Sequence, residues 1–508
     1  MEGTTGHALH ARFQRGLRRS PQGIAVTVDG RSVTYTELHR LALDWAGPLV
    51  RDGHRTVGVL TAKTVTAYAG ILAALYAGAA VVPLRPDFPA ARTRAMLHAS
   101  GATALLADAR GEAAAIALTD GDDQPSVRVY TPERTPADPA GALAEPRPVR
   151  PGDPAYLLFT SGSTGRPKGV VITHAATAHY FGLLDERYDF TPRDVFSQTF
   201  DLNFDCSLFD IFCAWGAGAR LLAIPAQAYR DLPRYLHDQG VTVWFSTPSA
   251  IRLARRMGTL GKGALSGLRW SFFAGEALTC RDAADWRDAA PGATLENLYG
   301  PTEATITVSA YRWSDTGTPP LAANGTVPIG AIHAGHDVLL LDPDGQAAAD
   351  EGELCVSGPQ LTPGYLDPAD DGGRFFDHAG RRWYRTGDRV RRLPDGAGML
   401  YLGRLDSQLQ VQGWRIEPAE IEHALRACPG IQDAVAVGAP GGTGTELFVF
   451  YTGTPQPPVE IARPLRGLLP EGVVPRHYRH LDDLPLNSNR KIDRGALTAR
   501  AAELLNRR

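Results

Sequence analysis

The sequence has little lysine, little cysteine and little excess of charge, and each shortage narrows the class of protein. Of its 52 lysines and arginines only four are lysines, so a lysine inside a glycine-rich or loop segment stands out. The five cysteines are scattered, with neither a disulfide framework nor a metal-ligand spacing, which fits a reducing cytoplasm. A formal net charge of -3 favours neither nucleic acid nor an anionic membrane as the main partner.

Long apolar runs are also scarce. The segment 67-AYAGILAALYAGAAVVPL-84 has about the length of a membrane span, but it is mostly alanine and glycine, and Gly78 and Pro83 divide it. We predict a buried helix followed by a strand there. The N-terminal segment 1–20 lacks the apolar core of a signal peptide, so no export is expected.

The remaining apolar runs predict an α/β protein. At 508 residues the chain is too long for one core and should divide into at least two domains. Short apolar runs alternate with helical stretches, which predicts βαβ units and a largely parallel sheet. The predicted strands lie at 56–61, 79–84, 104–108, 155–160, 219–225, 241–247 and 270–278, and the predicted helices at 36–49, 89–100 and near 230–240.

The pattern changes twice in the second half of the chain. From about residue 335, strands separated by Gly, Asp and Pro turns suggest a small β-barrel or meander. After 403–408 a clear amphipathic helix at 418–428 is followed by strands and a lysine-bearing loop. We place a boundary at Asp406, between a large N-terminal domain, 1–405, and a small mobile α+β domain, 406–508.

One glycine-rich segment carries the first chemical signal. In 159-FTSGSTGRPKGVVITH-174, glycines, hydroxyl residues and Lys168 lie between two apolar runs. Backbone N–H groups, hydroxyls and an ammonium can converge on anionic oxygens, which is the chemistry of a phosphate cradle. No Gly-Lys-Ser/Thr triplet closes the segment, so it is not a Walker loop. Taken alone, it is also compatible with an exposed turn whose glycines only permit positive φ.

The joint order of several motifs resembles the adenylate-forming superfamily, and within it the amino-acid adenylation domains of nonribosomal peptide synthesis. The resemblance covers nearly the whole chain, and the joint order is far more specific than any one motif. The motifs are 33-VTYTELHRLA-42, 75-LYAGAAVVPL-84, 157-LLFTSGSTGRPKGVVITH-174, 298-LYGPTEAT-305, 353-ELCVSGPQLTPGYL-366, 384-YRTGDRV-390, 403-GRLDSQLQVQGWRIEPAEIE-422 and 485-PLNSNRKIDRGAL-497.

The resemblance implies that the protein binds ATP and Mg²⁺ while a substrate carboxylate attacks the α-phosphorus. Tyr299 would stack on adenine, Asn297 would bond the adenine edge, and Asp388 would bind the ribose with help from Arg404. Glu303 would hold Mg²⁺, which prefers oxygen ligands and is usually shared with the nucleotide. The implied ATP-binding residues are Thr160, Ser161, Gly162, Ser163, Thr164, Gly165, Asn297, Tyr299, Gly300, Thr302, Asp388 and Arg404.

The resemblance assigns catalysis to two lysines. Lys168 would bring a mobile positive charge to the β- and γ-phosphates. Lys491 would lie between the substrate carboxylate and the α-phosphate, where one well-placed donor is worth on the order of 10² to 10³ in rate. The family usually has glycine where Arg490 stands, which leaves the backbone of this loop in doubt.

A second half-reaction is also implied, in which the phosphopantetheine thiol of a carrier protein displaces AMP. Asp406 matches the hinge about which the C-terminal domain would swing, and 412–418 would line the thiol tunnel. Gln410 and Gln412 stand where the family usually has Lys and Arg. The chain stops soon after Leu497, so we expect a freestanding enzyme that delivers its product to a separate carrier protein.

The substrate pocket is expected around 200-FDLNFDCSLFDIF-212. Asp205 matches the aspartate that binds an α-ammonium, although Asp201 or Asp210 would take its place if the register is wrong. A buried ammonium without a counter-charge costs several kcal/mol, so this aspartate favours an α-amino acid over a fatty or aryl acid. The uncharged wall favours proline first and valine-like side chains second. The implied wall residues are Cys206, Phe209, Phe245, Phe272, Ala274, Leu298, Ile306 and Thr307.

Three other functions remain alternatives. A D-alanine–carrier ligase shares nearly every motif, but that family has cysteine where Ala274 stands. An acyl-coenzyme A ligase is disfavoured by Asp205. A nucleotide-binding regulatory module without chemistry is disfavoured because both Lys168 and Lys491 are retained.

Overall fold

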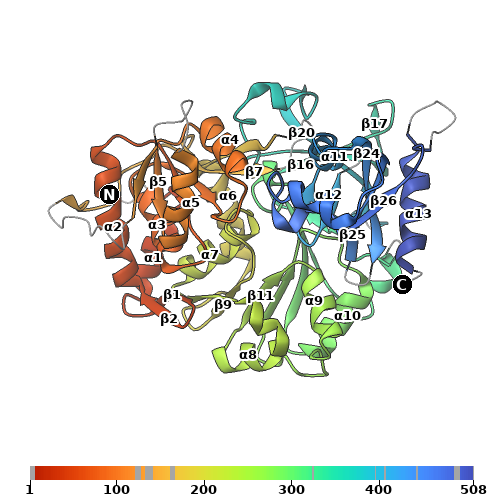
Figure 1. The fold of residues 1–508 in the computed structure, drawn as a ribbon. Coiled ribbons are helices and arrows are strands. Elements are labelled where there is room, and N and C mark those ends of the chain that lie inside the picture. Colours follow the sequence, from red (N-terminus) through yellow and green to blue (C-terminus); the bar gives the residue numbers. More distant parts are fainter. Residues whose placement is uncertain are drawn as a thin grey trace. The chain divides into compact units, whose positions relative to one another are not determined.

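The computed structural model describes residues 6–119, 127–131, 141–160, 166–322, 325–394, 396, 398–405, 408–441, 444–485 and 492–506. The chain divides into two compact units (Figure 1). The first comprises Met1–Pro86, Leu97–Leu158 and Gly169–Leu405, and the second comprises Asp87–Met96, Phe159–Lys168 and Asp406–Arg508. The predicted boundary residue Asp406 lies outside the described residues, and the division at this point remains a prediction.

Helices form where apolar residues recur at helical spacing and a cap is available. In α2 (Tyr35–Arg51), the Thr34 hydroxyl accepts from the Glu37 N–H while the Glu37 carboxylate accepts from the Thr34 N–H, a capping box. α7 (Cys206–Ala217) ends at Gly218, whose φ of 79° is left-handed. The other helices outside the C-terminal segment are α1 (Ala11–Arg19), α3 (Val65–Tyr76), α4 (Ala90–Ser100), α5 (Ala109–Thr119), α6 (His174–Arg187), α8 (Leu232–Gln239), α9 (Ser249–Arg256) and α10 (Cys280–Ala289).

The first sheet has the strand order β6-β5-β3-β4-β7-β8. Its strands are β3 (Thr56–Leu60), β4 (Ala80–Leu84), β5 (Ala104–Ala107), β6 (Arg128–Tyr130), β7 (Pro154–Thr160) and β8 (Lys168–Thr173). Those from β6 to β7 are parallel. Every residue of α3 is buried and β4 follows it closely, which confirms the helix–strand unit predicted at 67–84. Across the ranges given above, no helix is both long and apolar enough to span a bilayer.

The second sheet has the order β15-β14-β13-β12-β11-β9-β10-β1-β2. Its middle strands, from β13 to β1, are parallel, and β14, β15 and β2 pair antiparallel at the edges. The strands are β1 (Ile24–Val28), β2 (Arg31–Thr34), β9 (Val195–Gln198), β10 (Arg220–Ala223), β11 (Val243–Ser246), β12 (Trp270–Phe273), β13 (Thr294–Tyr299), β14 (Ser309–Arg312) and β15 (Ala331–Ile332). The largely parallel α/β arrangement predicted from the sequence is confirmed.

The two faces of this second sheet pack into different hydrophobic cores. Because successive side chains of a strand point to opposite faces, Trp244 and Phe273 lie in one core while Phe245 and Phe272 lie in the other. The core that contains Phe245 and Phe272 also includes residues of α3 and of β3 and β4, so it joins the two sheets. This shared core is where the candidate site forms.

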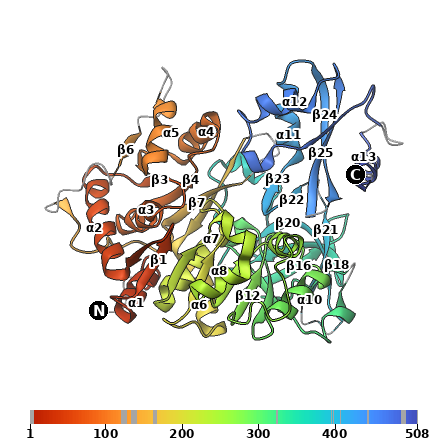
Figure 2. The same ribbon diagram turned by 60° about the horizontal axis from the view of Figure 1, so that its bottom comes forward.

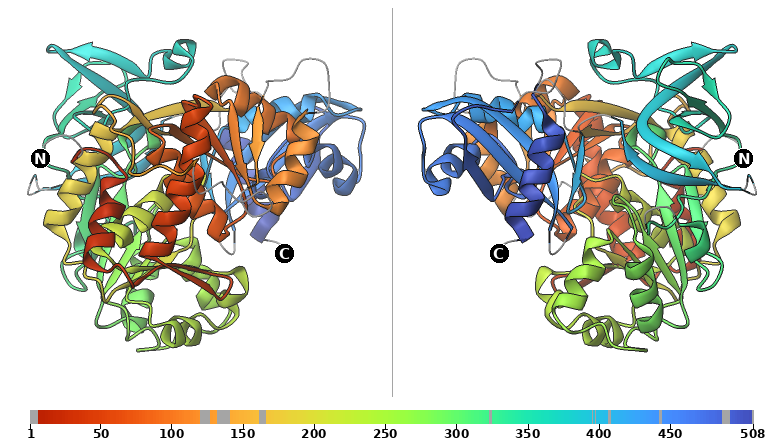
Figure 3. Two further views of the ribbon diagram at one scale, coloured as in Figure 1. Left: turned by 90° about the vertical axis from the view of Figure 1, so that its left-hand side faces the viewer. Right: turned by 90° about the vertical axis from the view of Figure 1, so that its right-hand side faces the viewer.

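An antiparallel sheet occupies the region predicted as a small β-barrel or meander (Figure 3). Its strands are β16 (Asp337–Leu341), β17 (Ala347–Ala348), β18 (Glu351–Ser357), β19 (Phe375–His378), β20 (Arg381–Arg392) and β21 (Met399–Arg404). The long strand β20 pairs with β18, β19 and β21. The pairing of Asp388 with Arg404 between β20 and β21 places two predicted nucleotide-binding residues side by side.

The C-terminal segment forms an α+β unit around β24 (Ile431–Gly441), β25 (Gly444–Gly453) and β26 (His477–His480). Ala434 and Ala436 of β24 share a core with α11 (Pro418–Arg426) and α12 (Pro458–Leu465). Val435 and Val437 face the other way, in a core with α13 (Arg494–Asn506), so helices cover both faces of the sheet (Figure 2). A short hairpin, β22 (Leu409–Val411) and β23 (Trp414–Ile416), precedes α11. The predicted α+β character of this part is confirmed.

Candidate active site

Predicted site residues of the first unit lie at the carboxyl ends of parallel strands β9, β11, β12 and β13. In open α/β sheets, ligands bind outside this edge. The loop after β9 leads to Asp205, β12 ends just before Ala274, and β13 ends at Tyr299, just before Gly300 and the turn at 302–307. The sheet thus gathers predicted residues that are about 100 positions apart in the sequence.

Three phenylalanines form a continuous aromatic wall at this edge. Phe245 and Phe272 are direct neighbours on β11 and β12, with ring centroids 6.2 Å apart. Phe209 of α7 closes the group, with its ring centroid 4.9 Å from that of Phe245 and 5.3 Å from that of Phe272. All three side chains are fully buried. The same core holds the other apolar residues predicted for the pocket, namely Cys206, Ala274, Leu298 and Ile306.

Asp205 lies at the N-terminus of α7, beside this wall. It is only 9% exposed, and burial raises its pKa to about 6, although hydrogen bonds from Thr302 and Cys206 partly oppose that rise. The contact with Thr302 connects the loop before α7 to the turn after β13. Thr307 belongs to that turn, and its hydroxyl lies 2.9 Å from the hydroxyl of Tyr180.

The two alternative aspartates have different surroundings. Asp201 forms an ion pair with Arg85 and lies 3.9 Å from the Lys63 ammonium, so it already has cationic partners. Asp210 is fully buried on α7, and neither carboxyl oxygen has a hydrogen-bond partner in the described structure. Burial raises the pKa of Asp210 well above its usual value, and Lys63 lowers it in part. Asp201 is thereby disfavoured as an ammonium ligand, whereas Asp210 remains an alternative.

Three of the residues predicted to bind adenosine form one polar cluster. Asp388 of β20 accepts a hydrogen bond from the Tyr299 hydroxyl at 2.6 Å and one from Arg404 at 3.0 Å. Arg404 also donates to the carbonyl of Thr386 at 2.9 Å. Burial raises the pKa of Tyr299 well above its usual value, so this hydroxyl stays protonated and donates. The cluster is therefore ordered by its own hydrogen bonds.

Asn297 and Gly300 have structural constraints of their own. The Asn297 amide nitrogen donates to the carbonyls of Val327 and Pro328 at 3.3 and 2.9 Å, so these bonds already fix the side chain. At Gly300 a Cβ atom would lie 2.5 Å from the Cα of Thr307, so the close approach of these two segments needs glycine.

Glu303 lies in the 3₁₀ helix Thr302–Ala304, and it is fully buried. One of its carboxylate oxygens accepts a hydrogen bond from the Tyr365 hydroxyl at 2.5 Å. We did not predict Tyr365, or the neighbouring Gln360, as site residues, although both belong to the motif at 353–366. The evidence for a role of these two residues is their contacts with the turn after β13. These contacts join segments that are about 60 residues apart, so the sequence alone does not reveal them.

Other predicted residues belong to the second unit or are not described. Thr160 ends β7, Lys168 begins β8, and both are assigned to the second unit. Ser161, Gly162, Ser163, Thr164, Gly165, Asp406 and Lys491 lie outside the described residues, as does Arg490. Their roles remain predictions.

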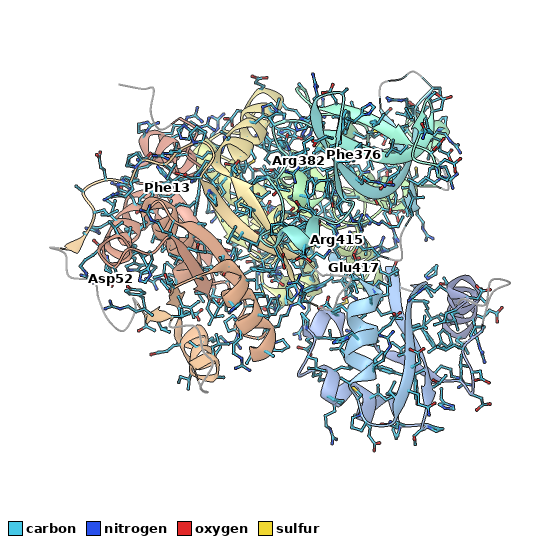
Figure 4. The ribbon with its side chains drawn as sticks, turned by 90° about the horizontal axis from the view of Figure 1, so that it is seen from above. Phe13, Asp52, Phe376, Arg382, Arg415 and Glu417 are labelled. Carbon is cyan, nitrogen blue, oxygen red and sulfur yellow. The ribbon has the colours of Figure 1, made fainter. Side chains whose placement is uncertain are left out.

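The segment predicted to line a thiol tunnel begins in the turn of the β22–β23 hairpin. Gln412 and Gly413 form its two-residue turn, with φ of 51° and 85°. Gln408, before β22, donates to Glu417 at 2.6 Å and accepts from Arg415 at 2.9 Å. Figure 4 labels Arg415 and Glu417 close to each other in this part of the chain. The amide of Gln408 thus links the two charged side chains after the hairpin.

Comparison with known families identifies the class of protein that this fold and site define. A family model described as AMP-binding enzyme matches residues 13–366, about seven-tenths of the chain. The protein therefore belongs to the AMP-binding enzyme family, and the predicted membership of the adenylate-forming superfamily is confirmed.

Comparison with individual proteins shows which members of this family the chain resembles. The chain is 32% identical over 508 residues to the L-proline--[L-prolyl-carrier protein] ligase of Pseudomonas fluorescens, covering 96% of this chain and 98% of that protein. It is 36% identical over 504 residues to the probable non-canonical nonribosomal peptide synthetase CymA of Salinispora arenicola, which covers 96% of this chain. That match spans only 6% of the length of CymA.

Solved structures show the same fold over the whole chain. The crystal structure of IdnL7 is 59% identical, with a TM-score of 0.75 over 98% of this chain and 99% of that one. The adenylation domain AlmE of Vibrio cholerae, solved in complex with glycyl-adenosine-5'-phosphate, is 28% identical, with a TM-score of 0.85 over 98% and 97% of the two chains.

Proposed function

We propose that this protein activates an uncharged α-amino acid with ATP and Mg²⁺ and transfers the aminoacyl group to the phosphopantetheine thiol of a carrier protein. In the first half-reaction the amino-acid carboxylate oxygen attacks the α-phosphorus, and the bond to pyrophosphate breaks. In the second, the thiol sulfur attacks the aminoacyl carbonyl carbon and AMP leaves. The carrier-protein ligase of Pseudomonas fluorescens and the adenylation domain AlmE support this proposal.

The observation that carries the proposal is the buried carboxylate of Asp205 in an apolar wall. A carboxylate whose pKa is raised to about 6 by burial is less stable as an anion than it would be in water. An α-ammonium beside it would supply the missing counter-charge. A fatty or aryl acid has no such group, so this carboxylate argues against an acyl-coenzyme A ligase.

The nucleotide would be held by residues that are already ordered. The carboxylate of Asp388 suits the vicinal hydroxyls of a ribose, and the hydrogen bonds from Tyr299 and Arg404 fix its orientation. Mg²⁺ would bind at Glu303, a hard oxygen ligand of the type it prefers, and would neutralise charge on the phosphates. Because Tyr365 occupies one carboxylate oxygen of Glu303, it would orient the other.

The substrate is proposed to have a small uncharged side chain. Proline is the first choice, in line with the 32% identical L-prolyl ligase, and valine-like amino acids are the second. Glycine is a further candidate because the three phenylalanine rings fill the wall and AlmE was solved with a glycyl adenylate. A D-alanine–carrier ligase remains the nearest alternative function.

The decisive experiment is amino-acid-dependent ATP–pyrophosphate exchange across the proteinogenic amino acids, D-alanine and their des-amino analogues. We expect exchange with small uncharged α-amino acids and none with the des-amino acids. A preference for a charged side chain or for an aryl acid would refute the proposed pocket. D-alanine as the best substrate would establish the alternative ligase instead.

Lys491 provides a second check of the chemistry. Lys491→Ala should reduce exchange by on the order of 10² to 10³ while leaving ATP binding nearly unchanged, because the lysine acts on charge in the transition state. Lys262→Ala is the matched control, since Lys262 is also one of the four lysines and is exposed at a loop. Near-normal exchange by a folded Lys491→Ala protein would exclude the proposed role.

A further inference from the structure

The turn that follows β13 has an unfavourable backbone. Thr305 and Ile306 have φ of 58° and 69°, in the left-handed region that β-branched residues rarely occupy. Both side chains are buried, with Thr305 at 0% and Ile306 at 1% exposure. Such a conformation persists only where surrounding groups hold it, and strained turns of this kind concentrate at functional sites.

Gln360 is the residue that holds this turn most directly. Its side chain is fully buried, and its amide nitrogen lies 3.1, 3.2 and 2.9 Å from the carbonyl oxygens of Ala304, Thr305 and Thr307. An amide nitrogen carries two hydrogens, so three carbonyls share two protons. In return, the Thr305 hydroxyl donates to the backbone carbonyl of Gln360 at 2.6 Å. One buried side chain thus bonds three carbonyls of four successive residues.

The following residues attach the same turn at its other end. The backbone N–H of Thr362 donates to the carbonyl of Glu303 at 2.8 Å, and the Tyr365 hydroxyl donates to the Glu303 carboxylate. The segment 360–365 therefore binds both the backbone of the turn and the side chain of Glu303. Tyr365 and Ile306 also belong to the hydrophobic core that forms the pocket wall, so polar and apolar contacts together hold the turn.

The turn connects the two halves of the candidate site. Thr302 contacts Asp205, Glu303 is the predicted Mg²⁺ ligand, and Ile306 belongs to the predicted pocket wall. A displacement of this backbone would therefore move groups proposed to bind the amino acid and groups proposed to bind Mg²⁺ together. A misplacement of about 1 Å at a reacting group can reduce a rate by about 10²-fold.

We propose that Gln360 is a positioning residue that fixes the strained turn at 302–307 and so sets the distance between the Mg²⁺ ligand and the amino-acid site. This inference rests on the proposed function for its catalytic consequence. Gln360 is fully buried and is not assigned to substrate binding. It acts through Glu303 and through Thr302, the partner of Asp205.

The first test compares Gln360→Leu and Gln360→Glu with the surface variant Gln346→Leu. Both variants at 360 have a side chain of similar volume; leucine has no donor, and glutamate has at most one. We expect the folded Gln360→Leu protein to need about 10-fold or more Mg²⁺ and amino acid for half-maximal exchange, a loss of the size that a misplaced turn produces. Its melting temperature should also fall, because buried carbonyls of the turn lose their donors, and Gln346→Leu should match the wild type.

A rescue experiment separates positioning from simple stabilisation. Glycine tolerates the left-handed region, so Thr305→Gly should reduce the need for an external support of the turn. We expect the Gln360→Leu/Thr305→Gly protein to recover part of the Mg²⁺ affinity that Gln360→Leu loses. Additive losses in the double variant, or unchanged Mg²⁺ and amino-acid dependence in folded Gln360→Leu and Gln360→Glu, would overturn the inference.

A readout without catalysis distinguishes this inference from the proposed function. Amide hydrogen exchange over 302–307 should accelerate at least 10-fold in Gln360→Leu and stay unchanged in Gln346→Leu, because local opening controls exchange. If the wild type activates no amino acid, the proposed function fails, and this measurement still tests whether Gln360 holds the turn. Unchanged exchange at the turn would refute the positioning role.

Discussion

On the nucleotide side of the candidate site, a tyrosine hydroxyl and an arginine donate hydrogen bonds to the carboxylate of Asp388. On the amino-acid side, by contrast, the carboxylate of Asp205 is buried beside phenylalanine rings and near a second acid, Glu303. The first carboxylate is stabilised by the fold itself. The second has a pKa raised to about 6, so the folded protein without a ligand destabilises its charge.

This difference between the two carboxylates suggests different roles for the two sides of the candidate site. A carboxylate that already has donors can orient a ribose with little rearrangement, because its geometry is fixed before the ligand arrives. Asp205 has no cationic partner among the described residues, so in the proposed function it would favour an α-amino acid over an acid without the ammonium. We therefore propose that the nucleotide side provides order and the amino-acid side provides selectivity.

The largest effect is expected from removing the charge of Asp205. Asp205→Asn should lower kcat/KM of amino-acid-dependent exchange by about 10² to 10³-fold or more, since it leaves a buried ammonium unpaired. The same change should raise thermal stability at neutral pH, because a shift of about two pKa units corresponds to about 3 kcal/mol. Exchange kinetics and thermal unfolding test both expectations.

Two further asparagine variants control this prediction. Asp288→Asn, at an exposed position, should change neither the kinetics nor the stability. Asp210→Asn should stabilise the fold but spare activation. If Asp210→Asn abolishes activation and Asp205→Asn does not, the ammonium ligand is Asp210.

The next largest effect is expected on the nucleotide side. Asp388→Asn should raise KM for ATP by about 10- to 100-fold, because a charge-assisted hydrogen bond is worth about 1.5–3 kcal/mol. KM for the amino acid should change much less. Tyr299→Phe should have a smaller effect. Tyr311→Phe should have none; Tyr311 lies on the neighbouring strand β14, and the change removes its hydroxyl contact with Thr318. Equal effects on both substrates would contradict the separation of the two sides.

Measuring the kinetics over a range of pH should distinguish the contribution of Asp205 from that of Asp388 without any mutation. The pKa of Asp205 is raised to about 6, so its proton is present below pH 6 and the ammonium loses its partner. We expect kcat/KM for the amino acid to fall about tenfold between pH 7 and pH 5, as one protonation with a pKa of about 6 implies. KM for ATP, measured over the same range, is the control. An amino-acid dependence that is flat down to pH 5 would refute the raised pKa.

The stability dependence on pH has the opposite sign. Because the folded pKa of Asp205 lies above the usual value of 3.8, the folded state keeps a proton that the unfolded chain has released. The stabilisation from this group is complete below pH 3.8 and is lost as the pH rises through about 6. The difference in unfolding free energy between wild type and Asp205→Asn should therefore widen over that interval.

The smallest effect is expected from the aromatic wall. Phe272→Leu should shift the preference toward a larger side chain by about fivefold, within the range that one or two methylene groups are worth in an apolar pocket. Phe273→Leu is a close control, because Phe273 is the next residue of the same strand, is equally buried, and faces the other core. A specificity change in both variants would show that the wall was assigned to the wrong face.

The sequence located most elements because their signals are local. The strand predicted at 56–61 is β3, Thr56–Leu60, and the helix predicted at 36–49 is α2, Tyr35–Arg51. The strand predicted at 270–278 ends at Phe273 instead, because Gly275 with φ of 82° takes the chain out of the extended conformation. Local apolar periodicity gives the existence of an element more reliably than its end.

The site was predicted in part for the same reason. Glu303, Tyr299 and Asp388 were predicted as site residues because each lies in a short motif. Gln360 and Tyr365 were missed as site residues because their importance lies in contacts with a turn that is distant in sequence.

The sequence alone determined three features: the order of the motifs, the alternation of helices and strands, and the presence of an aspartate within an apolar run. Only the tertiary structure decided which groups meet. Phe272 and Phe273 are indistinguishable in sequence, yet strand pairing turns one toward the site and the other away. Likewise, Asp201 acquires Arg85 while Asp205 remains buried, because the fold determines which charges each carboxylate can reach. Burial and long-range pairing belong to no single segment, so no segment could specify them.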